Sequence, residues 1–275
     1  MKIIIHRGAQ QIGGCITEIS NQGTRIVIDV GSNLPGVGGG YAPVSRITKD
    51  CTGVFITHYH GDHIGEYRNI GGNTPVYMGK QAKEIFKIVQ ERLALISSTT
   101  GVTDNAINRI NDFQAFEKFA SDDITVTPIR TDHSAFDSYM FLVEGKSNNG
   151  EIQRILHTGD FRTHGYYGSR FLDDLRYKLD GKTVDVPICE GTMLSRKKDN
   201  DLSKNYDIIY SEEELHSDAS RIFSETKNVF ILCSSTNIDT ISSFYSAARK
   251  NGKLVIVDHY QEDILNSTRA GALNI

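Results

Sequence analysis

Three histidines and one aspartate fall within the short segment His58-Tyr59-His60-Gly61-Asp62-His63. In an extended segment, residues two apart point to the same side, so the imidazoles of His58 and His60 can bind one metal ion together. Gly61 then lets the backbone turn, and Asp62 and His63 can face a second ion close to the first. The spacing therefore predicts a site for two metal ions.

Two further candidate ligands come later in the chain, and each follows a predicted strand, as the first cluster does. The cluster follows the apolar residues 53–57, His133 follows residues 124–129, and Asp160 follows residues 153–156. The Asp160 carboxylate can bridge two ions, and nitrogen and oxygen donors suit Zn²⁺, Mn²⁺ or Mg²⁺. Two such ions activate a water and polarise the bond under attack, so the predicted chemistry is metal-assisted hydrolysis.

The elements that position these residues are strands on both sides of two helices. Apolar periodicity predicts strands over 2–5, 15–19, 25–30, 53–57, 124–129, 139–143, 153–156 and 184–188. Helical spacing predicts helices over 80–97 and 103–119. The glycine-rich run 36–40 lacks the lysine of a phosphate-binding loop, so we expect an ordinary loop there.

The pattern changes after a charged stretch over 195–205, which we expect to be a linker or surface loop. Ser211 opens a capping box for a helix to Ser224, and a strand over 229–233, a helix over 239–250 and a strand over 253–257 follow. These elements predict a βαβ unit. We therefore expect one domain over residues 1–200 and part of a second over 201–275.

The ligand pattern resembles that of the metallo-β-lactamase superfamily, in which the same motif is followed by a lone histidine and then an aspartate. The resemblance spans residues 1–200 and implies an α/β (α+β) fold, an αββα sandwich with the metal site at one edge of two packed sheets. It assigns the first metal to His58, His60 and His133, and the second to Asp62, His63 and Asp160. Asp29, near the end of a predicted strand, matches an aspartate that orients a ligating histidine; the alternative is a turn residue at a strand end.

The segments 133–138 and 158–162 look like those of ribonuclease J and its β-CASP relatives, which act on nucleic acids. Residues 186–192 are similar to that group's next motif, in which a carboxylate, here Glu190, supports a later histidine. The unit from residue 201 looks like the start of a β-CASP domain. In it, Ser234, Ser235 and Thr236 can bind a phosphate or merely cap the following helix. Thr240 stands where the family often has an arginine, which weakens the phosphate interpretation.

The resemblance implies an RNA-cleaving hydrolase with two divalent ions, zinc first and manganese as the alternative. Asp62 would help to orient the nucleophile, and Glu190 would assist the leaving-group proton through the later histidine. Two alternatives stay open: a hydrolase of the same fold acting on a thioester, lactone or lactam, and an inactive metal-binding module for protein association.

The composition restricts the classes of partner and the cellular compartment, but it does not indicate a function. The net charge of −4 gives no global attraction to RNA, which would need a local basic groove. No apolar run approaches the ~20 residues that cross a bilayer, and the start of the chain does not resemble a signal peptide, so we expect a cytosolic protein with reduced cysteines.

The family's last two histidines have no counterpart before Ile275, and His259 fits a surface or packing position. We therefore expect an N-terminal portion of such an enzyme that is a poor nuclease alone. A strand over 253–257 at an unfinished sheet edge would favour homo-oligomers.

Overall fold

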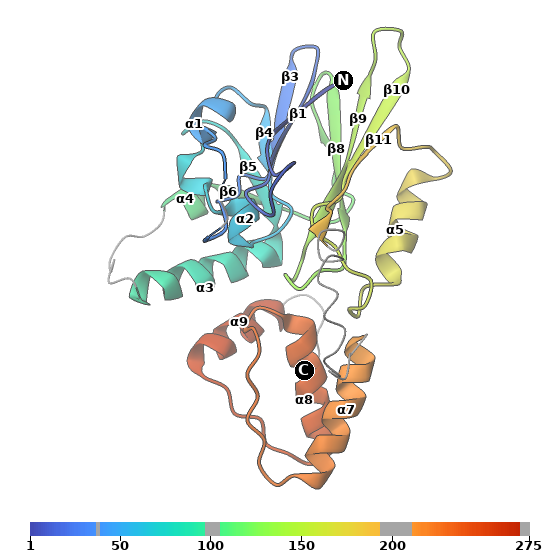
Figure 1. Cartoon of the computed structure of the whole chain (residues 1–275). Coiled ribbons are helices and arrows are strands. Elements are labelled where there is room, and N and C mark those ends of the chain that lie inside the picture. The colour runs from blue at the N-terminus through green and yellow to red at the C-terminus, as the bar shows by residue number, and fades with distance from the viewer. Residues whose placement is uncertain (37–38, 97–104, 193–210, 270–275) are drawn as a thin grey trace.

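The computed structural model describes residues 1–36, 39–96, 105–192 and 211–269. Within these ranges two β-sheets pack face to face, helices cover their outer faces, and a group of helices lies beyond one end (Figure 1). The predicted four-layer sandwich is confirmed.

The first sheet has six strands in chain order, β1 to β6. The first three strands pair antiparallel and the rest pair parallel. Their bounds are β1 Lys2–Arg7, β2 Ile16–Asn21, β3 Thr24–Ile28, β4 Gly53–Phe55, β5 Val76–Gly79 and β6 Ile110–Phe113. The turn between β2 and β3 has Gln22 in the left-handed region at φ 47°.

The second sheet has five strands in the order β11-β10-β9-β8-β7, antiparallel except for the parallel pair β10 and β11. Their bounds are β7 Phe119–Ala120, β8 Ile124–Arg130, β9 Tyr139–Lys146, β10 Ile152–His157 and β11 Val186–Ile188. The strands that we predicted to precede His133 and Asp160 are therefore both in this sheet.

Three apolar clusters hold the layers together. The first joins the outer face of the first sheet to its helices, including Ile85 and Phe86. The second lies between the sheets around Phe55, Phe113 and Phe141. The third packs Phe171 of a helix on the outer face of the second sheet. The helices of the sandwich are α1 Val44–Ile47, α2 Gly61–Ile64, α3 Lys80–Ile96, α4 Asn105–Asn108 and α5 Arg170–Leu179, with a 3₁₀ turn η1 at Tyr67–Asn69.

Residues 211–269 contain three helices, α7 Glu212–Glu225, α8 Ile238–Lys250 and α9 His259–Arg269. The predicted cap of α7 is confirmed, because Ser211 Oγ accepts a hydrogen bond from the Glu214 amide at 3.1 Å. Ile238 and Ile264 join the first apolar cluster of the sandwich, so these helices pack against it. None of the described helices is long and apolar enough to span a membrane.

The predicted helix over 103–119 is wrong in its described part. Residues 105–108 form the short α4, but Ile110–Phe113 is strand β6, paired with β5. Ile110 and Phe113 are three residues apart, as in a helix, yet both are buried by the sheet. Pairing with a neighbouring strand outweighs the local periodicity here.

The predicted strands at 229–233 and 253–257 are also wrong. Neither segment is paired in a sheet of the described residues, and helix α9, which we did not predict, follows the second segment. Phe230 and Leu232 are fully exposed, at 99% and 102%. A strand needs a neighbour for its backbone groups, and the described residues provide none for these segments. The charged stretch 195–205 lies outside the described residues.

Candidate metal centre

The residues with metal-binding potential gather where strands of both sheets end. His58 follows β4, His60 immediately precedes α2, and His63 lies within α2. His58 and His63 are almost fully buried, at 0% and 2% exposure. Gly61 is not needed for a special turn, contrary to our expectation: it begins α2, its φ is not in the left-handed region, and a Cβ there would meet open space.

Three imidazoles form the first group of donors. Nδ1 of His60 lies 3.1 Å from Nε2 of His58 and 3.3 Å from Nε2 of His133. Burial lowers the pKa of all three, and that of His133 to about 3, because charged imidazolium ions are poorly solvated and would repel one another. The rings are therefore neutral at physiological pH and keep the lone pairs that a metal ion requires.

The second group joins a histidine to carboxylates. Nε2 of His63 lies 3.3 Å from Asp160 Oδ1 and 3.9 Å from Asp62 Oδ2. Burial opposes the charge on His63, but Asp29 and Asp160 outweigh it and hold its pKa well above the usual value. Burial likewise opposes ionisation of Asp160, and the bond to His63 outweighs it, so the Asp160 pKa is lowered. The donor atoms of His58, His63 and Asp160 lie within 4.8 Å of one another.

Asp29 and Thr57 contact one histidine of each group on the side away from the other donors. Asp29, fully buried with φ 61°, accepts hydrogen bonds from the Thr57 amide and hydroxyl, and its Oδ2 lies 2.7 Å from Nδ1 of His63. Because the Thr57 hydroxyl donates to a carboxylate, its lone pair is free for Nδ1 of His58 at 3.0 Å. These contacts turn Nε2 of both imidazoles toward the other donors.

The donor set fits divalent metal ions. Nitrogen donors converge from His58, His60 and His133, and a histidine with carboxylates lies beside them. Contacts of Nδ1 with Thr57 and with Asp29 fix the rings of His58 and His63. Neutral imidazole with carboxylate is the ligand chemistry of zinc and of similar ions. The predicted ligands are thus brought together, with Asp62 the most distant in the second group.

Comparison with curated proteins finds sequence similarity to ribonuclease J. Over 267 residues the chain is 25% identical to ribonuclease J of Mycoplasma genitalium, covering 92% of this chain and 43% of that protein. Ribonuclease J of Helicobacter pylori strain 26695 is 26% identical over 174 residues, 59% of this chain and 23% of that protein. This chain is similar to ribonuclease J. It spans less than half the length of these curated relatives. No protein-family model matches the chain.

One solved structure supports the fold. A protein of unknown function from Enterococcus faecalis V583 superposes with a TM-score of 0.74 at 19% identity, covering 98% of this chain and 67% of that one. The metallo-β-lactamase BJP-1 of Bradyrhizobium japonicum is a more distant neighbour, with a TM-score of 0.42 at 14% identity, covering 98% of this chain and 95% of that one.

Glu190, predicted from the ribonuclease J-like motif, lies on the loop after β11. Its Oε1 accepts a hydrogen bond from the Phe161 amide at 2.9 Å. Because Phe161 directly follows Asp160, this contact holds the loop that carries Asp160.

Sequence reasoning missed the role of Arg162. Its guanidinium lies 3.3 Å from Asp132, 3.7 Å from Glu212 and 2.6 Å from Asp239, so it joins the loop of His133 to the starts of α7 and α8. Arg162 is thus engaged by carboxylates rather than free to bind phosphate. Thr240, at the position of the family's arginine, donates a hydrogen bond to Glu212 at 2.8 Å. No short motif in the sequence signals this network.

The predicted phosphate-binding residues lie in the segment that enters α8. Ser234 is exposed, and its hydroxyl lies 3.2 Å from that of Thr236. The side chain of Asn237 precedes α8 without capping it. The backbones of Ala135 and Asn237 form an antiparallel bridge, which places this segment beside the loop of His133.

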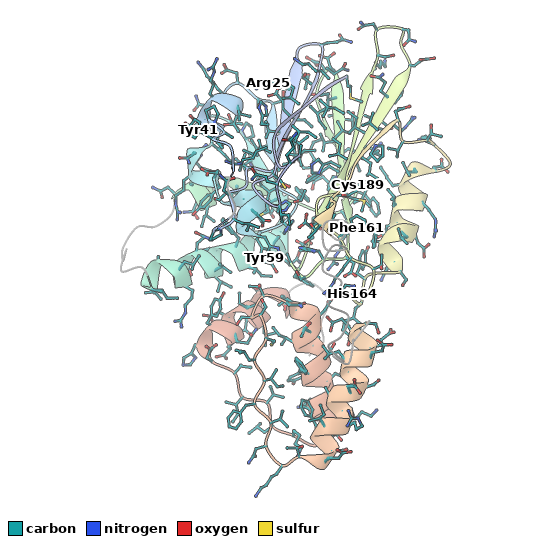
Figure 2. The ribbon with its side chains drawn as sticks, viewed as in Figure 1. Arg25, Tyr41, Tyr59, Phe161, His164 and Cys189 are labelled. Carbon is teal, nitrogen blue, oxygen red and sulfur yellow. The ribbon has the colours of Figure 1, made fainter. Side chains whose placement is uncertain are left out.

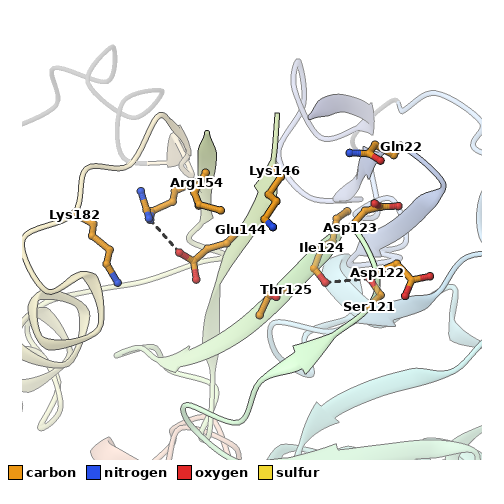
Figure 3. A pocket seen from close by; sticks show the side chains of 12 residues that line it. Gln22, Ser121, Asp122, Asp123, Ile124, Thr125, Glu144, Lys146, Arg154 and Lys182 are labelled. Atoms are coloured by element: carbon orange, nitrogen blue, oxygen red, sulfur yellow. Dashed lines mark hydrogen bonds and ion pairs between the residues drawn. The ribbon is translucent and has the colours of Figure 1, made fainter. Parts of the chain in front are cut away.

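Two other features lie outside the two groups of donors. His259 is fully exposed at the start of α9 and contacts Glu262, as expected for a surface histidine. A polar depression of about 420 Å³, shown in Figure 3, is lined by residues at the starts of β8 and β10 and the end of β9, including Ile124, Lys146 and Arg154. Since His133 and Asp160 follow the opposite ends of β8 and β10, this depression lies at the far end of the sheet.

Proposed function

We propose that this chain forms the metal-binding part of a phosphodiester hydrolase that acts on RNA. The convergence of imidazole and carboxylate donors at one sheet edge carries the proposal. Similarity to ribonuclease J over 92% of the chain supports RNA as the substrate class.

The proposal includes two divalent ions, zinc first and manganese as the alternative. His58, His60 and His133 would hold one ion, and Asp62, His63 and Asp160 the other. When bound, such ions supply a reactive water at neutral pH and stabilise charge on the phosphoryl oxygens. The Asp62 side chain, 19% exposed, would help to orient that water. Glu190 would act by fixing the loop of Asp160 and, through a further histidine, by assisting the leaving group.

We further propose that residues 201–275 belong to a second domain of the β-CASP type, set against the metal-binding domain of residues 1–200. The contact between Ala135 and Asn237 supports this arrangement. Ser234, Ser235 and Thr236 would bind backbone phosphates of the RNA, since the hydroxyls of the exposed Ser234 and the half-buried Ser235 and Thr236 precede the N-terminus of α8.

The test is turnover by the full chain loaded with Zn²⁺ or Mn²⁺. Its substrates are labelled single-stranded 5′-phosphorylated RNA, bis(p-nitrophenyl) phosphate, nitrocefin and a thioester. We expect slow cleavage of the two phosphodiesters, as for a poor nuclease, loss of that cleavage in His133→Ala, and no loss in the matched surface control His259→Ala. Turnover of nitrocefin or the thioester without RNA cleavage would identify a small-molecule hydrolase instead. Metal binding without any turnover would favour the association module.

A further inference from the structure

Tyr59 stands between two metal-binding residues but has a different environment from theirs. His58 and His60 turn toward the imidazole group, whereas the Tyr59 hydroxyl contacts Phe136 and Thr236. Figure 2 shows Tyr59 at the end of the sandwich nearest the three C-terminal helices. The side chain is 6% exposed and belongs to the apolar cluster that includes Ile238 and Ile264.

The Tyr59 hydroxyl is shared by two other segments. It accepts a hydrogen bond from the Phe136 amide at 2.7 Å, three residues after His133, and donates one to the Thr236 carbonyl at 3.0 Å. The backbone bridge between Ala135 and Asn237 lies beside it. One phenol therefore ties together the His58 loop, the His133 loop and the segment that enters α8.

The two parts of this side chain have separable effects. The ring packs among apolar residues, and a phenylalanine would keep that packing. The hydroxyl satisfies a buried amide and a carbonyl that would otherwise lose their partner.

We propose that Tyr59 is a positioning residue whose hydroxyl fixes the segment 234–237 relative to the metal-binding residues. The inference rests on the proposed function: an RNA strand long enough to reach both regions would depend on this fixed spacing. A small phosphodiester that reaches only the metal-binding residues would depend far less on this spacing.

The test compares Tyr59→Phe with the wild-type chain and with Tyr67→Phe. Tyr67 is an equally buried tyrosine of the same apolar cluster, but its hydroxyl donates to Gln90 at 3.4 Å. Hydrogen exchange measured by mass spectrometry should rise about fivefold in peptides covering Phe136 and 234–240 in Tyr59→Phe alone, as loss of one hydrogen bond predicts. Metal content should match the wild type in both variants.

Steady-state kinetics supply the second measurement. In Tyr59→Phe we expect KM for single-stranded RNA to rise about tenfold and KM for bis(p-nitrophenyl) phosphate to change by less than about twofold. Unchanged exchange in both segments would overturn the positioning role, whether or not the chain cleaves RNA. Altered exchange with equal KM changes for both substrates would overturn the link to RNA. Failure of the wild-type chain to cleave RNA would instead refute the proposed function, and the exchange result would still decide what Tyr59 does.

Discussion

Oδ2 of Asp29 lies 2.7 Å from Nδ1 of His63, and both side chains are buried. The contact fixes which nitrogen of His63 faces Asp160. It also places a negative charge behind the imidazole, which strengthens a histidine as a metal ligand. Asp29 adopts a positive φ of 61° at this position, so the backbone itself is shaped to bring the carboxylate here.

Replacing this carboxylate should weaken metal binding without removing a ligand. In the variant Asp29→Asn the side chain keeps its size but loses its charge. We expect affinity for Zn²⁺ at the second group to fall about 10–100-fold, as for other residues that support a ligand. Competition with a chromophoric chelator measures this change, with Asp173→Asn on the exposed surface of α5 as the control. Equal affinities in the two variants would show that Asp29 has no such role.

A methyl group at Gly31 should disrupt the segment that carries Asp62 and His63. A Cβ at Gly31 would lie 1.6 Å from the Asp62 carbonyl oxygen, which the Cys15 amide holds in place at 2.9 Å. We expect Gly31→Ala to destabilise the fold by about 3 kcal/mol or more. Gly61→Ala is the matched control, since a Cβ there meets open space in α2 and alanine favours a helix by ~0.5–1 kcal/mol. Urea unfolding distinguishes the two; equal stabilities would contradict the packing.

Replacing the Arg162 guanidinium with an uncharged group should leave the carboxylates of Asp132, Glu212 and Asp239 without the cation that they share. Arg162 and the side chains of Asp132 and Glu212 are largely buried, so we expect Arg162→Met to cost about 3–5 kcal/mol of unfolding free energy. The control is Arg176→Ala, because its pair with Asp173 is exposed and contributes about 0–1 kcal/mol. Similar losses in both variants, measured by urea unfolding, would mean that the network contributes little to stability.

The grouping of the candidate ligands could be predicted from sequence because the segments that carry them follow strands, and strand ends meet at one edge. The sequence could not indicate that Asp137 would accept hydrogen bonds from the amides of Gln81 and Ala82, at the start of α3, because the pair lies far apart in the chain. The same holds for Arg162 and its carboxylates.

Secondary structure predicted from the local sequence pattern was wrong where tertiary contacts determine the structure. Ile110 and Phe113 fit a helix, but pairing with β5 makes a strand. Segments 229–233 and 253–257 have strand-like composition, yet without a neighbouring strand in the described residues they remain unpaired. Composition indicates what a segment can form, and the available partners determine what it does form.

The exposed apolar side chains of these unpaired segments should promote self-association. Phe230 and Leu232 present apolar surface with unpaired backbone beside it. We expect the apparent mass in light scattering to rise with protein concentration, and Phe230→Ser combined with Leu232→Ser to reduce that rise. Leu95→Ser, an exposed position on α3, serves as the control. A monomer at all concentrations would contradict this prediction.

Elemental analysis of the metal-to-protein ratio tests the central claim most directly. The full chain is dialysed against buffered Zn²⁺ beside two double variants: His58→Ala with His60→Ala, and the exposed pair His164→Ala with His259→Ala, with circular dichroism to verify folding. We predict that the wild-type chain and the surface variant retain bound zinc and that the His58/His60 variant loses it. An equal zinc content in all three folded proteins would contradict the metal centre described above.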